Sequence, residues 1–218
     1  MNSAAAFFDL DGTLLTVNSA RLWLRRERRL GRIADWQLLL AAAMLGGYRI
    51  GVFAMESALR VSLSTLRGVP EDLIRAETRT WWREEVRPFL APGARAVLDR
   101  HRRVGNRLVL LTSSSKYAAE MALEEFGLDD ALFQRYETRD GRFTGEPLLP
   151  ICYGRGKVQV AEEWARGNGV DLARSSFYSD SSTDVPMLAR VGHPFAVRPD
   201  PRLRLLARLR GWPVLDWR

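Results

Sequence analysis

Two aspartates that lie two residues apart, Asp9 and Asp11, carry the strongest chemical signal in this sequence. They stand in FFDLDGTLL, directly after the apolar run of residues 4–8. At such a strand end one carboxylate can act as a nucleophile while the other serves as acid and base for the leaving group. Gly12 then permits a tight turn. An aspartate that only caps a helix is the ordinary alternative, but the order D-x-D-G-T after a buried strand is unusual for a cap.

Two later segments offer groups that bind phosphate. Thr112 ends the apolar part of RLVLLTSSS, where a hydroxyl and the following backbone N–H groups can cradle an anion at a helix N-terminus. An ordinary N-cap is the alternative, and the serines at 113–115 leave the register open by one residue. Lys157 in CYGRGKV can neutralise phosphate as a point cation or lie solvated on the surface. Only Lys116 and Lys157 are lysines among 33 basic residues, which favours a specific use slightly.

The segment YSDSSTD supplies two more carboxylates, Asp180 and Asp184. Magnesium prefers oxygen ligands, usually one or two carboxylates together with waters and phosphate. Asp180, at a strand end opposite Asp9, would supply one ligand, and Asp184 would either ligate the metal or orient a ligating water. Helix or turn capping is the alternative for an isolated D-x-x-x-D in a loop.

The elements that must position these residues follow an alternating order. Apolar runs that break into polar residues at 4–8, 107–115 and 175–184 predict strands of a parallel sheet, whose ligands bind beyond the carboxyl ends of the strands. Amphipathic patterns predict helices at 93–103, 116–126 and 156–168 and a short helix opening near Asp184. Residues 136–148, with a DG turn, predict a hairpin.

Residues 17–87 show helical patterns and no convincing strand, and they are too long for a simple crossover between two strands. We expect an α/β core made of residues 1–16 and 88–218, with a helical domain of residues 17–87 inserted. Within the insert, the apolar stretch 36–47 is too short to span a bilayer. It predicts a buried helix, with a membrane-surface contact as the alternative.

Composition narrows the class of protein. The 218 residues are 46% hydrophobic, which suits a folded domain, and carry a net charge of +7. The arginines that supply this charge are scattered, so we expect no specific nucleic-acid partner. The single cysteine, Cys152, excludes an intrachain disulfide and a cysteine cluster for zinc, and we expect a cytoplasmic protein without a transmembrane segment. The sequence carries no signal for the oligomeric state.

Taken together and in order, these motifs resemble those of the haloacid dehalogenase superfamily. FFDLDGTLL matches its first motif, LVLLT its second, Lys157 its third and SDSSTD its fourth. The segment GRFTGEPLLPICYGRGKV and the one beginning FYSDSSTDVPML are similar to subfamily IB, the phosphoserine-phosphatase-like group. The resemblance covers the whole chain and implies a Rossmann-like core with a type 1 cap inserted after the first motif.

The resemblance implies a phosphatase that hydrolyses a small phosphorylated metabolite with Mg²⁺. Asp9 would attack phosphorus, and Asp11 would protonate the leaving oxygen and later activate water. Dehalogenases of the superfamily lack the second aspartate, and its phosphate-pumping ATPases carry a threonine there. The remaining roles that the resemblance implies are phosphate binding by Thr112, Ser113 and Lys157, and Mg²⁺ binding by Asp9, the carbonyl of Asp11 and Asp180, supported by Asp184.

Three positions depart from the family pattern. Ser179 stands where the fourth motif commonly has glycine, and we expect so small a side chain to be tolerated. In the cap, Asn18 falls where a glutamate binds the amine of phosphoserine. Ser62 falls where an arginine binds its carboxylate, with Arg60 two residues earlier. Asn18 and Arg60 remain candidate substrate contacts, but losing two charge-assisted hydrogen bonds predicts that phosphoserine is not the preferred substrate.

Other functions stay open at this point. The same subgroup contains phosphatidylglycerophosphate phosphatases, so a lipid phosphate is one alternative substrate, and phosphotransfer to another acceptor is a second alternative. A catalytically inactive protein that binds phosphate or nucleic acid is the alternative outside enzymes. The full set of Asp9, Asp11, Thr112, Lys157 and Asp180 argues against inactivity.

Overall fold

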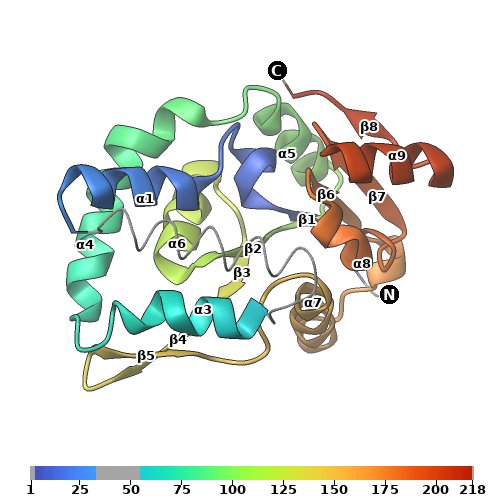
Figure 1. Cartoon of the computed structure of the whole chain (residues 1–218). Coiled ribbons are helices and arrows are strands. Elements are labelled where there is room, and N and C mark those ends of the chain that lie inside the picture. The colour runs from blue at the N-terminus through green and yellow to red at the C-terminus, as the bar shows by residue number, and fades with distance from the viewer. Residues whose placement is uncertain (1–2, 33–54, 218) are drawn as a thin grey trace.

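The computed structural model describes residues 3–32 and 55–217. Its centre is a six-stranded parallel sheet in the order β3-β2-β1-β6-β7-β8 (Figure 1). The strands that carry the motifs, β1, β2 and β6, are therefore neighbours. The strand bounds are β1 Ala5–Phe8, β2 Arg107–Ser115, β3 Asp130–Gln134, β6 Ser176–Ser179, β7 His193–Val197 and β8 Val214–Leu215.

Apolar side chains alternate across the central strands and bury both faces of the sheet. On β1, Ala5 and Phe7 face one core cluster, whereas Ala6 and Phe8 face the other, and all four are fully buried. Helices α5 (Ala94–Arg103) and α6 (Lys116–Phe126) cover the face of Phe8. Helices α7 (Arg155–Asn168), α8 (Val185–Leu188) and α9 (Pro201–Arg210) cover the face of Phe7. Helices on both faces of a parallel sheet make this the predicted α/β fold of Rossmann type.

The helical insert follows β1 and precedes β2. Its described helices are α1 (Ser19–Arg29), α3 (Met55–Ser64) and α4 (Glu71–Trp81), and within the described part of 17–87 no named strand occurs. The stretch 36–47 lies outside the described residues. The structure thus has the predicted cap between the first two motif strands, while the boundaries at 16/17 and 87/88 remain a prediction. None of the helices in the described ranges has the length and apolar character needed to cross a membrane.

The predicted hairpin is present as β4 (Tyr136–Arg139) and β5 (Arg142–Pro147), but its packing was not foreseen. It lies along α3 (Figure 1) and is tied to the α3–α4 loop by backbone hydrogen bonds. Gly68 N donates to Phe143 O at 2.8 Å, and Phe143 N donates to Val69 O at 3.0 Å. The hairpin therefore joins the chain after β3 to the helical insert.

Candidate active site

The carboxyl ends of β1, β2 and β6 bring the first, second and fourth motifs to one edge of the sheet. In the parallel register, Phe8 of β1 lies beside Leu110 of β2 and Tyr178 of β6. Asp9, the residue after β1, continues this pairing because its N–H donates to Tyr178 O at 2.9 Å. Asp9 is buried, with only 6% of the residue exposed, so the fold determines the surroundings of its side chain.

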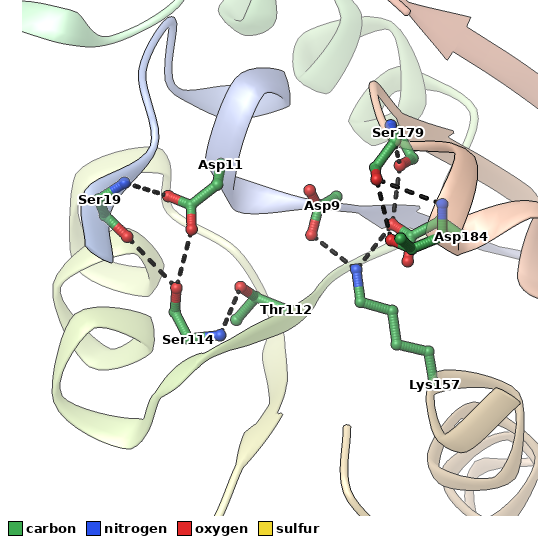
Figure 2. Close-up of polar contacts among 10 residues, drawn as sticks. Asp9, Asp11, Ser19, Thr112, Ser114, Lys157, Ser179 and Asp184 are labelled. Atoms are coloured by element: carbon green, nitrogen blue, oxygen red, sulfur yellow. Dashed lines mark hydrogen bonds and ion pairs between the residues drawn. The ribbon is translucent and has the colours of Figure 1, made fainter. Parts of the chain in front are cut away.

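Lys157, at the start of α7, lies between two of the predicted carboxylates (Figure 2). Its Nζ donates to Asp9 Oδ1 at 2.8 Å and to Asp184 Oδ2 at 2.7 Å. Ser179 Oγ donates to the same Oδ2 of Asp184 at 2.7 Å. All four residues are buried, so this is a preformed internal network and not a solvated surface lysine.

Negative charge exceeds positive charge in this network. Burial lowers the pKa of Lys157, but attraction to Asp184 and Asp9 outweighs burial and leaves the pKa raised, so the ammonium stays charged. Burial holds the pKa of Asp9 well above its usual value, although Lys157 opposes this effect. Burial, with repulsion from Asp184, raises the pKa of Asp180 to about 7. A single ammonium thus faces several carboxylates that lack compensating charge.

Asp11 belongs to a second network on the side of the insert (Figure 2). Its Oδ1 accepts from the N–H of Ser19 at 2.7 Å, and its Oδ2 accepts from Ser114 Oγ at 3.1 Å. The hydroxyls of Ser19 and Ser114 lie 3.3 Å apart. The first residue of α1 and the end of β2 therefore fix the Asp11 carboxyl group, and burial raises its pKa. A raised pKa favours a protonated carboxyl that can act as a general acid.

Gly12 allows the turn that separates the two aspartates. Its φ of 75° is left-handed, and a Cβ built there would lie 2.1 Å from Asp180 Oδ2. Only glycine therefore lets the Asp180 carboxyl group approach this turn. Arg198, which follows β7, donates from Nη2 to the carbonyls of Gly12, Thr13 and Leu15 at 2.8, 3.0 and 3.0 Å.

The hydroxyl run of residues 112–115 forms the carboxyl end of β2. Thr112 is buried, and its Oγ1 accepts from the N–H of Ser114 at 3.1 Å. The N-cap of α6 is Ser115, whose hydroxyl accepts from the N–H of Ala118. Thr112 is therefore not the helix cap, and it lies between the Asp9 and Asp11 networks (Figure 2). Ser113 is exposed at the same edge of the sheet.

The donor chemistry of this edge suits a hard cation. Asp9, Asp11, Asp180 and Asp184 offer only oxygen atoms, and burial raises the pKa of the first three. Within the described ranges no three acidic, histidine or cysteine side chains converge as a complete metal cluster. Such a site fits Mg²⁺, which commonly takes one or two carboxylates and completes its shell with water and phosphate.

The two candidate cap contacts lie in different places. Asn18 lines a cleft of about 400 Å³ together with Asp11 and Asp180, but its Oδ1 already accepts from the N–H of Arg21 as the N-cap of α1. Arg60 is not part of that cleft. Its guanidinium pairs with Glu146 of the hairpin at 2.5 Å and with Glu56 at 3.0 Å. Its substrate role stays a prediction, while its contacts join α3 to β5.

Sequence reasoning missed four residues that organise the site. Ser19 and Ser114 hold Asp11, Ser179 bonds Asp184, and Arg198 holds the turn after β1. Ser179, which replaces the usual glycine of the fourth motif, is therefore not merely tolerated, because its hydroxyl donates a hydrogen bond to Asp184. Ser179 could have been found from its place in the fourth motif, whereas Arg198 is one of many scattered arginines.

Comparisons with known proteins agree with this arrangement. A family model described as haloacid dehalogenase-like hydrolase matches residues 6–189. A phosphoserine phosphatase of Mycobacterium tuberculosis is 33% identical over 231 residues, covering 99% of this chain and 71% of the relative. A histidinol-phosphatase of Neisseria meningitidis is 27% identical and covers 98% of each chain. The crystal structure of a protein of unknown function from Bordetella pertussis superposes with a TM-score of 0.89 at 32% identity, covering 100% of each chain. The chain therefore belongs to the haloacid dehalogenase-like hydrolases and is phosphoserine-phosphatase-like within them.

Proposed function

We propose that this protein is a Mg²⁺-dependent phosphomonoester hydrolase that works through an aspartyl-phosphate on Asp9. The observation that carries the proposal is the buried ion pair between Asp9 Oδ1 and Lys157 Nζ at 2.8 Å, placed at the edge where three motif strands end. The ammonium orients this carboxylate and can also neutralise the oxygens of an incoming phosphoryl group. Phosphoryl transfer depends mainly on such positioning and charge compensation.

The first half of the reaction transfers the phosphoryl group to the protein. A carboxylate oxygen of Asp9 forms a bond to phosphorus as the ester P–O bond breaks. Asp11, whose pKa burial raises, gives its proton to the departing oxygen. Thr112, the Ser113 N–H and Lys157 hold the phosphoryl oxygens during the transfer.

The second half releases phosphate. Asp11, now a carboxylate, accepts a proton from water while the water oxygen bonds to phosphorus and the Asp9–phosphorus bond breaks. Ser19 and Ser114 keep the Asp11 carboxyl group in place through both halves. Asp9, Asp180 and the Asp11 carbonyl would hold Mg²⁺, with Asp184 in support. The bound cation would supply charge compensation at the phosphoryl oxygens.

We further propose that phosphoserine is not the preferred substrate. Asn18 has no charge for an amine, and its Oδ1 is used by the N-cap of α1. Ser62 is exposed and offers no charge for a carboxylate. The phosphatases named among the relatives act on different esters, phosphoserine and histidinol phosphate, so similarity to them does not select one substrate.

The test is hydrolysis of p-nitrophenyl phosphate and of a panel of phosphorylated metabolites with Mg²⁺, for the wild type and Asp9→Asn. We expect turnover by the wild type, loss of at least about 1,000-fold in Asp9→Asn, and loss on removal of Mg²⁺ by EDTA. Equal inactivity of both proteins across the panel would contradict the enzymatic proposal. A strong preference for phosphoserine would contradict only the substrate proposal.

A further inference from the structure

The cleft beside Asp11 is lined by both acidic and basic residues. Asp11 and Asp180, which are half-buried, are the acidic residues, and Phe89 contributes an apolar side chain. The first turns of α1 supply the basic residues Arg21 and Arg25. A molecule whose phosphoryl group reached Asp9 through this cleft would pass directly beside these two guanidinium groups.

Arg21 and Arg25 differ from other arginines of α1 in their partners. Arg26 pairs with Glu27 and Arg29 pairs with Glu85, so these two stabilise the packing of the insert. Arg21 and Arg25 form no ion pair with any of the residues 3–32 and 55–217, and both are exposed. They lie four residues apart, so their charges stand one above the other on the face that lines the cleft.

Like charges at this spacing weaken a helix, so the stability of α1 gives no reason for the pair. An anion held between the two side chains would remove the repulsion. Guanidinium groups bind carboxylate and phosphate through paired N–H donors, and two such groups in one cleft can hold a single anion from both sides.

We propose that Arg21 and Arg25 form a subsite for a second anionic group, a carboxylate or a second phosphate, on the phosphomonoester substrate. The inference rests on the proposed function, because the first phosphoryl group is taken to lie at Asp9. It also sets a direction of selectivity. An ester that carries an ammonium group, such as histidinol phosphate or phosphoserine, meets two like charges in this cleft and binds more weakly than its counterpart without the amine.

Binding is measured by isothermal titration calorimetry in the Asp9→Asn protein with Mg²⁺, so that the ligands are not consumed. The first set of probes is 3-phosphoglycerate, glycerol 3-phosphate and phosphoserine, which differ at the carboxylate or at the amine. The second set is propane-1,3-diol bisphosphate against 3-hydroxypropyl phosphate. The pair with the larger arginine-dependent preference identifies the second anion as carboxylate or phosphate.

We expect the probe with the second anion to bind at least about tenfold more tightly than its neutral counterpart. Changing both arginines, Arg21→Gln and Arg25→Gln, abolishes this preference. The matched control is Arg204→Gln with Arg208→Gln, which removes two exposed arginines at the same spacing on α9, away from α1 (Figure 1). The control keeps the preference, and raising the salt from about 0.05 M to about 0.5 M reduces it.

Equal affinity within both sets of probes, or a preference that survives in the Arg21→Gln, Arg25→Gln protein, would overturn the inference. Turnover of p-nitrophenyl phosphate by the wild type is measured in parallel. Turnover without the preference leaves the proposed function standing and removes the subsite. The preference without turnover by the wild type keeps the subsite and removes the proposed function.

Discussion

Ion pairs hold both the sheet edge and the helical insert, but the two regions differ in burial. Lys157, Asp9 and Asp184 have side chains that are 3%, 9% and 2% exposed. In contrast, Arg60 and Glu146, which join the insert to the hairpin, are 51% and 34% exposed. Buried charges must keep their partners, because an unpaired charge is costly there, whereas exposed charges are solvated when a pair opens. The ion pairs at the sheet edge are thus held by burial, whereas the pair that joins the insert to the hairpin can open at little cost.

The largest difference between the two regions is expected when each of the two lysines is replaced by methionine. Lys157→Met leaves Asp9 and Asp184 buried without their cation, and we expect a loss of about 3–5 kcal/mol in the free energy of unfolding. The Nζ of Lys116 lies 3.3 Å from Glu71 Oε1, and the lysine side chain is 43% exposed. For Lys116→Met we therefore expect a loss of only about 0–1 kcal/mol in the free energy of unfolding. Urea unfolding measures both. Similar losses for the two variants would show that burial does not separate the regions.

One glycine in each region, Gly12 at the sheet edge and Gly31 in the insert, allows a second test of the difference between the regions. Gly12 and Gly31 both have left-handed φ angles, of 75° and 68°. Among residues 3–32 and 55–217, nothing lies within 4 Å of a Cβ built at Gly31, so for Gly31→Ala we expect only the backbone cost of about 1–2 kcal/mol. Gly12→Ala also drives its methyl group into Asp180, so we expect a loss of at least about 2 kcal/mol together with loss of turnover. Thermal unfolding and hydrolysis of p-nitrophenyl phosphate provide the two measurements, and an active Gly12→Ala protein would refute the close approach of Asp180.

Arg198 tests how far the sheet-edge region extends from the reacting groups. Its guanidinium holds three carbonyls of the turn that carries Asp11, so Arg198→Met is expected to cost about 1–3 kcal/mol of stability. We expect kcat to fall more than KM rises, because Arg198 holds the turn that positions Asp11 and is not itself among the residues that line the cleft. Arg198→Lys should recover part of kcat. A variant with normal kcat would limit Arg198 to a structural role.

The smallest effect belongs to the exposed bridge between insert and hairpin. Arg60→Gln and Glu146→Gln, made singly and together, are expected to show a coupling below about 1 kcal/mol in a double-mutant cycle. A coupling as large as that of the Lys157 network would place this bridge among the fixed parts of the molecule.

Much of the fold could be predicted because the central strands and helices carry clear patterns. The patterns predict a strand at 107–115 and a helix at 116–126, and β2 and α6 have these same bounds. β8, by contrast, has only Val214 and Leu215, which are too short for a periodic signal. The attachment of the hairpin to the α3–α4 loop depends on backbone hydrogen bonds across distant segments, which no local pattern encodes.

Some residues of the candidate site could likewise be predicted from sequence motifs, whereas others could not. Asp9, Asp11, Lys157 and Asp184 stand in ordered motifs, and the structure brings them to one edge of the sheet. Arg198 was missed because its value lies in reaching three carbonyls far away in the chain. The pairing that separates Arg26 from Arg21 in α1 likewise appears only when Glu77 and Glu85 are brought beside the helix.

The central claim is that Asp9 becomes phosphorylated during turnover. The most direct measurement is a rapid acid quench of the wild type mixed with a ³²P-labelled ester that it hydrolyses, followed by peptide mapping. We predict label on the peptide that contains Asp9, formed and lost at rates that match turnover, and no label on Asp9→Asn. Hydrolysis by the wild type without protein-bound label, together with retained hydrolysis by Asp9→Asn, would contradict the account.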